Sequence, residues 1–423
     1  MRILKTYFIA FIFIISCVFI YPNIALSKEP HAPASDEKED IYKHLELFAD
    51  AITIVDVNYV DEIEPKDLMY GALKGMLRSL DEHSDFLTPE QYEEIKIDTG
   101  GEFGGLGIEI TIADDLLTIV TPLEDTPAHR AGLMPNDKII RIDGASTKDF
   151  SLDDTVKMMR GRPGTKVTLT IMREGEEGLQ DYTLKRAIIK IESVKEALIL
   201  EDGIGYIRIT DFQQRTAQDL EKALRQLKKD KLSGFILDLR NNPGGLLDAS
   251  TAIAEKFLPM DTVIVSIRGR IQSQQEIFKA TSPRPYLDFP MVVLVNKGSA
   301  SASEIVAAAI KDNKRCILVG TPTFGKASVQ TIIPMRDGSA IRLTTSKYYT
   351  PSGEQIYKVG VIPNVIVERI RPIKEQEKEE NIFSKLERNK KANRVKRLKQ
   401  DNQVQSALEL LKGINIYESL SNK

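Results

Sequence analysis

The chain has 423 residues, of which 42% are hydrophobic and 28% are charged, and its formal net charge is −3. This length allows two or three domains with cores of their own. The nearly balanced charge excludes a general nucleic-acid-binding protein, which would be strongly basic. Of the two cysteines, Cys17 lies in an apolar leader and Cys316 in the strand-like run RCILVG. We therefore expect no internal disulfide in a mature chain, and we expect Cys316 to be a buried small residue and not a catalytic thiol.

The first residues predict an export signal. A basic lead, MRILK, precedes an apolar run from Tyr7 to Tyr21, and small residues follow at Ala25 to Ser27. This order is typical of a secretory signal peptide, so residues 1–27 are expected to be removed and the protein to act in the periplasm or another extracytoplasmic space. The apolar run is shorter than the ~18 residues of a confident membrane span. An uncleaved inner-membrane anchor is the alternative, and it would be the only contact with the membrane.

The next part of the chain predicts a linker and then helices. Residues 28–40 are polar and contain proline, which favours a linker, and residues 41–97 predict an N-terminal helical region. In LTPEQYEE, Thr88 is expected to cap a helix that begins at Pro89. Upstream, apolar residues recur at every fourth position, and this spacing predicts one helix face. These residues are Leu68, Ala72, Met76 and Leu80.

Residues 98–187 predict a small β-rich domain. Short β-like runs such as GLGIEITI and KVTLTIMR alternate with turns rich in Gly, Asp and Asn. One amphipathic segment, SLDDTVKMMRG, predicts a helix that Ser151 caps. Leu152, Val156 and Met159 share one face of that helix.

Residues 188–368 alternate strands with helices and predict an α/β core. The runs GYIRI, GFILDLR, TVIVSI, MVVLVN and CILVG read as strands, and several are continuously apolar, which is typical of strands buried on both faces. Residues 369–423 form a charged, lysine-rich tail. Near its end, apolar residues at helical spacing predict a short helix that docks on an apolar surface. They are Val404, Ala407, Leu408 and Leu411. The fold class expected is a multidomain α/β chain with an N-terminal helical segment and a charged C-terminal tail.

Three serines precede an alanine-rich segment in NKGSASASEI. Serine favours helix N-caps, and a serine at the positive end of a helix dipole could also be a nucleophile. A histidine base is not expected, because the α/β region contains no histidine. The four histidines are His31, His44, His83 and His129. The sequence also lacks H-E-x-x-H, C-x-x-C and Walker motifs, so we expect no metal and no cofactor.

A lysine can replace histidine as the base. Burial lowers the pKa of an amine from its reference value of about 10.4, and the neutral amine can then accept a serine proton. In TPTFGKASVQT, Lys326 stands among apolar and small residues. On an extended segment Lys326, Ser328 and Gln330 would share one face, and Gln330 could hydrogen-bond the neutral amine. The alternative is a surface lysine after a glycine turn.

A strand, a tight turn and a helix are predicted for LDLRNNPGGLLDAS. Such a turn can direct backbone N–H groups at a developing oxyanion. By itself it is a common strand-to-helix connection.

Together, these segments resemble the carboxy-terminal processing, or tail-specific, serine proteases. The likeness rests on GSASASEI, PTFGK followed by VQ, DLRNNPGG and GYIRIT. It implies that Ser301 is the nucleophile, Lys326 the base and Gln330 the third member of the catalytic set. Ser299 and Ser303 would then be capping or packing serines.

The same resemblance implies an oxyanion hole made by backbone amides. These would be the amide of Ala302, at the start of the alanine-rich helix, and that of Gly244 or Gly245. Ala327 departs from the family, in which glycine would be expected, and it could alter the flexibility of the loop beside the base.

GGLGIEITI and TPAHRAGLMPNDKIIRIDG resemble a PDZ domain. The resemblance implies that a glycine-rich loop binds a carboxylate through backbone N–H groups and that the next strand pairs with an incoming peptide. Asn136 stands where glycine is usual, and asparagine tolerates the left-handed conformation. The implied peptide-binding residues are Gly105, Leu106, Gly107, Ile108 and Val156, with Met159 as the alternative to Val156 near the pocket. A generic β-rich domain is the alternative.

The sequence therefore predicts an exported serine endopeptidase that recognises protein C-termini through a PDZ domain and cleaves by a Ser–Lys dyad. Its partners would be protein substrates with accessible C-terminal tails, and self-association or an activating adaptor stays open. One rival is a catalytically inactive PDZ scaffold of the envelope. Another is a hydrolase of a different substrate, such as an ester or a cell-wall amide.

Overall fold

The computed structural model describes residues 35–113, 115–148, 150–229, 232–370 and 390–421. The predicted signal peptide and residues 28–34 of the predicted linker lie outside the described residues. The chain divides into two compact units, residues 1–72 and residues 73–423. Within the described residues, no helix is long and apolar enough to cross a membrane.

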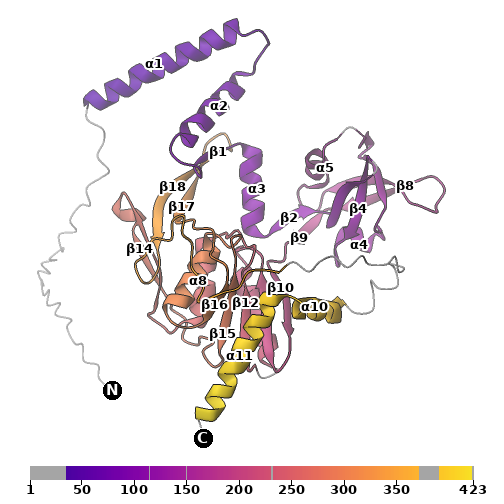
Figure 1. Cartoon of the computed structure of the whole chain (residues 1–423). Helices are drawn as coiled ribbons and strands as arrows, with labels where there is room; N and C mark the ends of the chain where they lie inside the picture. The colour runs from indigo at the N-terminus through magenta and orange to yellow at the C-terminus, as the bar shows by residue number, and fades with distance from the viewer. Residues whose placement is uncertain (1–34, 114, 149, 230–231, 371–389, 422–423) are drawn as a thin grey trace, which may run out of the picture. The chain divides into compact units, whose positions relative to one another are not determined.

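Two helices follow one another near the N-terminus, α1 (Ser35–Asn58) and α2 (Pro65–Arg78) (Figure 1). Residues 35–40, expected in a linker, are helical, because no proline lies between Pro33 and Pro65 and acidic residues near a helix N-terminus are favoured by its dipole. The predicted face of α2 is also wrong. Leu77 is its buried residue, whereas Met76 is 53% exposed and Leu80 lies beyond the helix end. A spacing of four residues turns by about 40° more than a full circle at each step, so the stripe drifts around the helix.

The predicted cap at Thr88 is confirmed. Helix α3 (Pro89–Gly100) begins with a capping box, in which the Thr88 side chain accepts the N–H of Gln91 and the Gln91 side chain accepts the N–H of Thr88. The short strand β1 (Asp85–Leu87) just before it pairs with a strand of the α/β core. The helical region therefore ends in an element of the core.

The β-rich domain that follows contains a sheet in the order β3-β4-β5-β7-β8, and β2 pairs with β9. Ser151 caps α5, and Asn136 has a φ of 70°, so both local predictions are confirmed. The elements are β2 (Glu102–Gly105), β3 (Ile108–Ala113), β4 (Leu116–Pro122), α4 (Pro127–Arg130), β5 (Lys138–Ile142), β6 (Ala145–Ser146), α5 (Leu152–Met159), β7 (Lys166–Met172), β8 (Leu179–Lys185) and β9 (Ala187–Lys190).

A largely parallel sheet forms the centre of the core, in the order β10-β11-β12-β15-β16-β19. Only β10 pairs antiparallel with its neighbour. Every residue of β12 and of β15 is buried, as their continuous apolar runs predict. The strands are β10 (Val194–Ile199), β11 (Ile204–Ile209), β12 (Gly234–Asp238), β15 (Met291–Val295), β16 (Ile317–Gly320) and β19 (Val365–Ile366).

A second, antiparallel sheet joins β1 to β18, β13 and β14, and β17 pairs with β18. The run TVIVSI is a strand, but it belongs to this second sheet. The strands are β13 (Val263–Gly269), β14 (Glu276–Lys279), β17 (Ser328–Pro334) and β18 (Ala340–Tyr349). Two 3₁₀ turns span Glu255–Phe257 and Gln272–Gln274.

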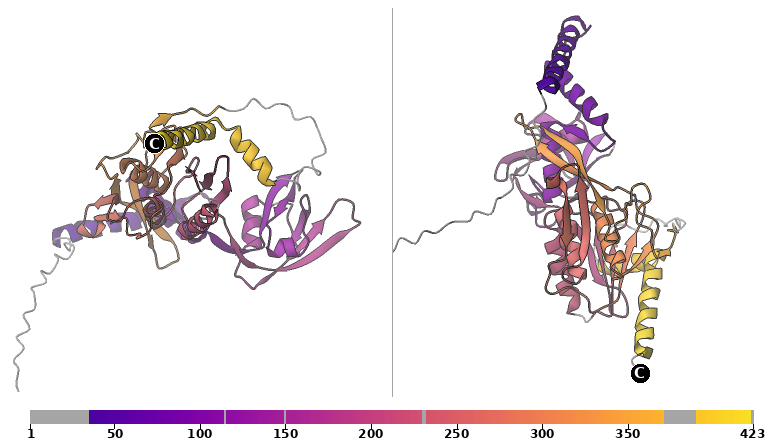
Figure 2. Two further views of the ribbon diagram at one scale, coloured as in Figure 1. Left: turned by 90° about the horizontal axis from the view of Figure 1, so that it is seen from below. Right: turned by 90° about the vertical axis from the view of Figure 1, so that its left-hand side faces the viewer.

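Helices cover both faces of the parallel sheet. Phe235 and Val293 pack with α6 (Thr216–Lys228), α7 (Leu247–Ala254) and α8 (Ala302–Asp312) on one face. The alternate residues Ile236 and Val292 pack on the other face with α11 (Asn402–Ser421), which follows α10 (Lys390–Lys399). Figure 2 shows α11, in yellow, against the core from two directions. Four α11 residues, Val404, Ala407, Leu408 and Leu411, are 0% exposed, and they are the set whose spacing predicts the helix. The expectation that this helix is short is wrong, because it has 20 residues.

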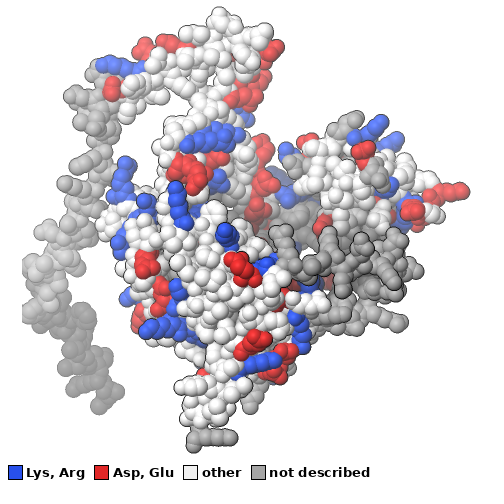
Figure 3. All heavy atoms as spheres, in the orientation of Figure 1, with Lys and Arg blue, Asp and Glu red and all other residues white. Residues whose placement is uncertain are grey.

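The surface is mixed in charge. On the face drawn in Figure 3, basic and acidic side chains are interspersed.

Cys316 is only partly buried, yet desolvation raises the pKa of its thiol to about 12. A thiol with this pKa carries almost no thiolate near neutral pH.

Candidate active site

The three serines of the SASAS run differ in exposure. Ser299 and Ser303 are 0% exposed, whereas Ser301 is partly exposed. The Ser299 hydroxyl donates to the carbonyl oxygen of Leu239 at 2.8 Å, and the Ser303 hydroxyl donates to that of Asn242 at 2.9 Å. Both outer serines are therefore occupied in packing, and only Ser301 keeps a hydroxyl that a substrate could reach.

Ser301 lies at the N-cap of α8 in a strained conformation, with φ 53° and ψ −114°. Non-glycine residues rarely adopt a positive φ, and such strain persists only where the surroundings enforce it. Here the N–H of Ser301 donates to Glu304 at 2.9 Å, and the N–H groups of Glu304 and Ile305 bind the Ser301 carbonyl oxygen. The turn presents Ser301 at the positive end of the helix dipole.

The turn that follows β12 is clamped to the serine turn. The carbonyl oxygen of Asn242 accepts the N–H of Ala300 at 3.0 Å and the Ser303 hydroxyl at 2.9 Å. Those two residues flank Ser301. A Cβ atom added to Gly244 would lie 2.8 Å from the Cβ of Ser301, so only glycine fits at this distance.

The backbone amides near Ser301 are not equivalent. The N–H of Gly244 donates to the side-chain oxygen of Asn242 at 2.9 Å. Phe212 pairs with this turn through the Gly244 carbonyl and the Leu246 N–H, and this pairing leaves the N–H of Gly245 unused. In the described part of the chain, the N–H groups of Gly245 and Ala302 have no hydrogen-bond partner. Of the two glycines, Gly245 is thus the one with an N–H available for an oxyanion.

Glu304 is a fully buried carboxylate that joins the serine turn to the lysine segment. Its Oε2 accepts the backbone N–H groups of both Ser301 and Lys326, each at 2.9 Å. Its Oε1 accepts the Thr323 hydroxyl at 2.5 Å and the Gly325 N–H at 2.7 Å. Burial raises the pKa of the Glu304 carboxyl, and these hydrogen bonds oppose the rise.

Lys326 is half-buried in the loop before β17. Burial is the main cause that lowers the pKa of Lys326, the positive charge of Arg342 lowers it further, and Glu304 acts in the opposite direction. Among the described residues, the Lys326 amine has no hydrogen-bond or ion-pair partner. A partly desolvated, unpaired lysine is easier to deprotonate than a free one.

Gln330 does not contact the Lys326 amine in this structure. Its Nε2 donates to the Ser328 hydroxyl at 2.8 Å and to the Thr344 hydroxyl at 3.4 Å. Ser328 and Gln330 thus share a face of β17, whereas Lys326 precedes the strand. The side-chain oxygen of Gln330 has no hydrogen-bond partner among the described residues, so it can still accept one.

The β-rich domain contains a pocket of about 130 Å³. All five residues predicted to bind a peptide line it, together with residues that the prediction did not include. The complete lining is Phe103, Gly105, Leu106, Gly107, Ile108, Ile110, Val156, Met159 and Arg160. Gly107 has a φ of 75°, and a Cβ there would lie 2.3 Å from Thr126. The pocket is therefore lined mainly by apolar side chains and by the backbone of two glycines.

Arg160 adds a cation to this pocket. Its guanidinium lies 4.8 Å from the centre of the Phe103 ring, and its Nε is buried without a hydrogen-bond partner. An unpaired guanidinium suits a carboxylate ligand. The sequence signal for Arg160 is only its place at the end of the predicted helix SLDDTVKMMRG.

The sequence analysis also did not identify Glu304 or Asn242 as residues of the site. Glu304 stands three residues after Ser301, and S-x-x-E is the signature of a capping box. Asn242 lies inside the predicted turn of LDLRNNPGG, but no local pattern indicates that its side-chain oxygen would accept the Gly244 N–H.

No group of three His, Cys, Asp or Glu in the described part of the chain could hold a metal ion.

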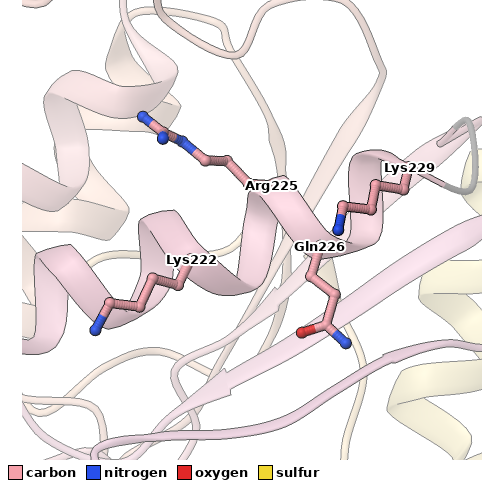
Figure 4. A pocket seen from close by; sticks show the side chains of 4 residues that line it. All are labelled: Lys222, Arg225, Gln226 and Lys229. Carbon is pink, nitrogen blue, oxygen red and sulfur yellow. The ribbon is translucent and has the colours of Figure 1, made fainter.

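A second surface hollow lies along α6 and is unrelated to this chemistry. Figure 4 shows its four side chains projecting from one helix in different directions. They are Lys222, Arg225, Gln226 and Lys229. Lys222 pairs with Asp219 at 3.0 Å and Arg225 with Glu221 at 2.8 Å, so two of the cations are already neutralised.

Comparisons with known proteins agree with this organisation. The profile of peptidase family S41 matches residues 203–367, that of the PDZ domain residues 94–172, and that of the activating protease CtpB N-terminal domain residues 15–87. The carboxy-terminal-processing protease of Bartonella bacilliformis is 41% identical over 367 residues, which cover 86% of this chain and 83% of that protein. The carboxyl-terminal-processing protease of Synechocystis sp. is 42% identical over 308 residues, 71% of each chain.

Among solved structures, the photosystem II D1 C-terminal processing protease is 30% identical, with a TM-score of 0.44, and covers 76% of this chain and 92% of its own. The extent and identity of the match to the two bacterial relatives, together with the S41 profile over the α/β core, are sufficient to assign the family. The chain belongs to the carboxy-terminal processing proteases of peptidase family S41 and carries a PDZ domain.

Proposed function

We propose that the chain is an exported serine endopeptidase in which Ser301 is the nucleophile and neutral Lys326 is its base. The observation that carries this proposal is the shared carboxylate of Glu304. It binds the backbone of Ser301, the partly exposed serine of the SASAS run, and the backbone of Lys326, whose pKa is lowered by burial. Both groups are thereby held against the same end of α8.

The chemistry then follows in two stages. Ser301 Oγ attacks the scissile carbonyl carbon and its proton passes to Lys326 Nζ, while the N–H groups of Ala302 and Gly245 stabilise the oxyanion. Lys326 gives the proton to the leaving amine, and the C–N bond breaks. A water molecule then gives a proton to Lys326 and attacks the acyl carbon, the bond from that carbon to Ser301 Oγ breaks, and Lys326 returns the proton to Oγ.

Gln330 would orient the base. Its free side-chain oxygen can accept a hydrogen bond from the Lys326 amine, while its Nε2 stays anchored on Ser328 and Thr344. A neutral amide cannot take the proton itself, so this role is one of position.

The PDZ pocket would capture the free C-terminus of a protein substrate. Its apolar lining suits an aliphatic terminal side chain, and its two glycines and Arg160 suit a carboxylate. Export rests on the N-terminal sequence, in which a basic lead precedes an apolar run.

The decisive experiment compares the wild type with Ser301→Ala and Ser299→Ala on an unfolded protein substrate, with products identified by mass spectrometry. Ser301→Ala should abolish cleavage but keep its fold and its binding of tail peptides. Ser299→Ala should lose ~1–3 kcal/mol of stability, because Leu239 and Asn296 lose a buried partner, but should still cleave. Activity in Ser301→Ala would refute the assignment. A wild type that binds tails but never cleaves them would favour the inactive scaffold.

A further inference from the structure

Polar side chains at the N-terminus of α11 form a buried hydrogen-bond network with Arg240 of the core. Asp401 caps the helix, and its Oδ1 accepts the backbone N–H groups of Gln403 at 3.0 Å and Val404 at 3.3 Å. The same carboxylate accepts Arg240 Nη1 at 3.0 and 2.9 Å, and the side-chain oxygen of Gln403 accepts it at 2.8 Å. The start of α11 is therefore bound to the Arg240 guanidinium, and Asp401 also pairs with the more exposed Arg369 at 3.9 Å.

The other side of that guanidinium binds the end of β12. Arg240 Nη2 donates to Asp238 at 2.6 Å, and Asp238 also accepts the Tyr206 hydroxyl at 2.6 Å. Arg240 is 6% exposed, Asp238 1% and Gln403 1%. Buried ion pairs of this kind contribute little net stability, but loss of one partner leaves an uncompensated charge. The arrangement thus favours one position of Arg240 over all others.

Arg240 begins the turn that shapes the oxyanion site. Two residues later, Asn242 accepts Ala300 and Ser303 on its carbonyl oxygen and the Gly244 amide on its side chain. The guanidinium is fixed at one end of this turn, and the serine turn is fixed to its middle. A shift of Arg240 would therefore move the backbone that carries the Gly245 amide.

We propose that Asp401 and Gln403 are positioning residues for catalysis, and that the C-terminal helix completes the active site by fixing Arg240. The inference rests on the proposed role of Ser301. The apolar residues of α11 supply its docking free energy, since Val404, Ala407, Leu408 and Leu411 are all fully buried. The polar residues at its N-terminus set the turn, so docking and positioning can be separated by substitution.

The test uses the full chain with Asp401→Asn, which keeps a helix cap but removes the charge that faces Arg240. It should lower kcat by about tenfold or more, with KM and tail-peptide binding little changed. Affinity for a peptide boronic acid, whose adduct on Ser301 places an oxygen in the oxyanion site, should fall by a similar factor. Asp401→Glu, which restores a carboxylate, should recover part of both losses.

Lys412→Gln is the matched control on the same helix, because Lys412 pairs with Glu201 and Asp202 and makes no contact with Arg240. It should leave kcat and boronate affinity unchanged. Should Asp401→Asn fail to fold, Gln403→Met removes one acceptor of Arg240 at similar volume and should act in the same direction.

A folded Asp401→Asn with wild-type kcat would overturn the inference and leave the proposed function standing. The inference would also be overturned if the loss of kcat in Asp401→Asn equalled the loss of folded protein, and if the molecules that stay folded bound the boronate with normal affinity. A wild type with no cleavage that depends on Ser301 would overturn both.

Discussion

The Glu304 carboxylate accepts the backbone N–H of Lys326 at 2.9 Å, although the two residues belong to different elements of the core. This contact joins the first turn of α8 to the loop before β17. The same oxygen also accepts the N–H of Ser301. One side chain therefore fixes the backbone positions of both the proposed nucleophile and the proposed base. Glu304 also places a negative charge near the Lys326 amine, which raises the pKa of that amine.

Glu304→Gln should therefore have two separable effects. An amide group cannot accept hydrogen bonds at both of its ends, so N–H groups of the site lose partners and kcat should fall by tenfold or more, since one lost buried bond costs about 1–3 kcal/mol. Loss of the negative charge should lower the pKa of Lys326, so the rising limb of kcat/KM should move to lower pH. The measurement is a pH profile beside Glu354→Gln, an exposed acid on another loop, which should match the wild type.

Lys326→Arg should be as inactive as Lys326→Ala. Arginine stays protonated at any working pH and cannot accept the Ser301 proton. In the wild type, the pKa of Lys326 is lowered, so the neutral amine forms at lower pH than in a free lysine and activity should rise there. Cleavage by Lys326→Arg at more than a small fraction of the wild-type rate would exclude the dyad.

Arg342→Gln should move the rising limb of the pH profile in the opposite direction from Glu304→Gln. The positive charge of Arg342 lowers the pKa of Lys326, so its removal should raise that pKa and shift the limb to higher pH. Arg336→Gln removes an exposed arginine from the neighbouring β17–β18 turn and serves as the control. An unchanged limb in Arg342→Gln would mean that another group controls the profile.

Gly244→Ala should nearly abolish cleavage. The new Cβ would lie 2.7 Å from the Ala300 carbonyl oxygen and 2.8 Å from Ser301 Cβ, so the turn and the serine must separate. The loss of an aligned oxyanion donor alone costs roughly 100- to 1,000-fold in kcat. Gly353→Ala is the control, since Gly353 has a similar positive φ with nothing within 4 Å. It should lose ~1 kcal/mol of stability and keep its kcat.

Capture of a chain end should depend on its carboxylate. Amidation of a tail peptide removes the anion and leaves every side chain in place, and it should weaken binding by roughly 10- to 100-fold. Gly107→Ala should weaken binding of the free acid as well, because its Cβ would lie 2.3 Å from Thr126. Gly132→Ala, at another positive φ in open space, should not. Equal affinity for acid and amide would show that the pocket does not read chain ends.

Several features of this protein can be predicted from local sequence patterns. The Thr88 and Ser151 caps, the buried strands β12 and β15 and the helix around Leu408 follow from spacing and from short-range hydrogen bonding. Residue pattern and resemblance together place Ser301, Lys326 and the PDZ loop. The sequence signals for these features lie within a few residues of each other, so the features can be predicted without knowledge of the tertiary contacts.

Tertiary structure decided the rest. Nothing local distinguishes Gly245 from Gly244 as a donor, because the choice depends on the Asn242 side chain and on Phe212. The link from Glu304 to Lys326 and that from Asp401 to Arg240 join residues distant in sequence. Such partners are chosen by packing, since a buried polar group must be satisfied by whatever the fold brings within hydrogen-bond distance. The sequence by itself predicts a nucleophile and a base, and the folded chain determines which groups hold these two residues in place.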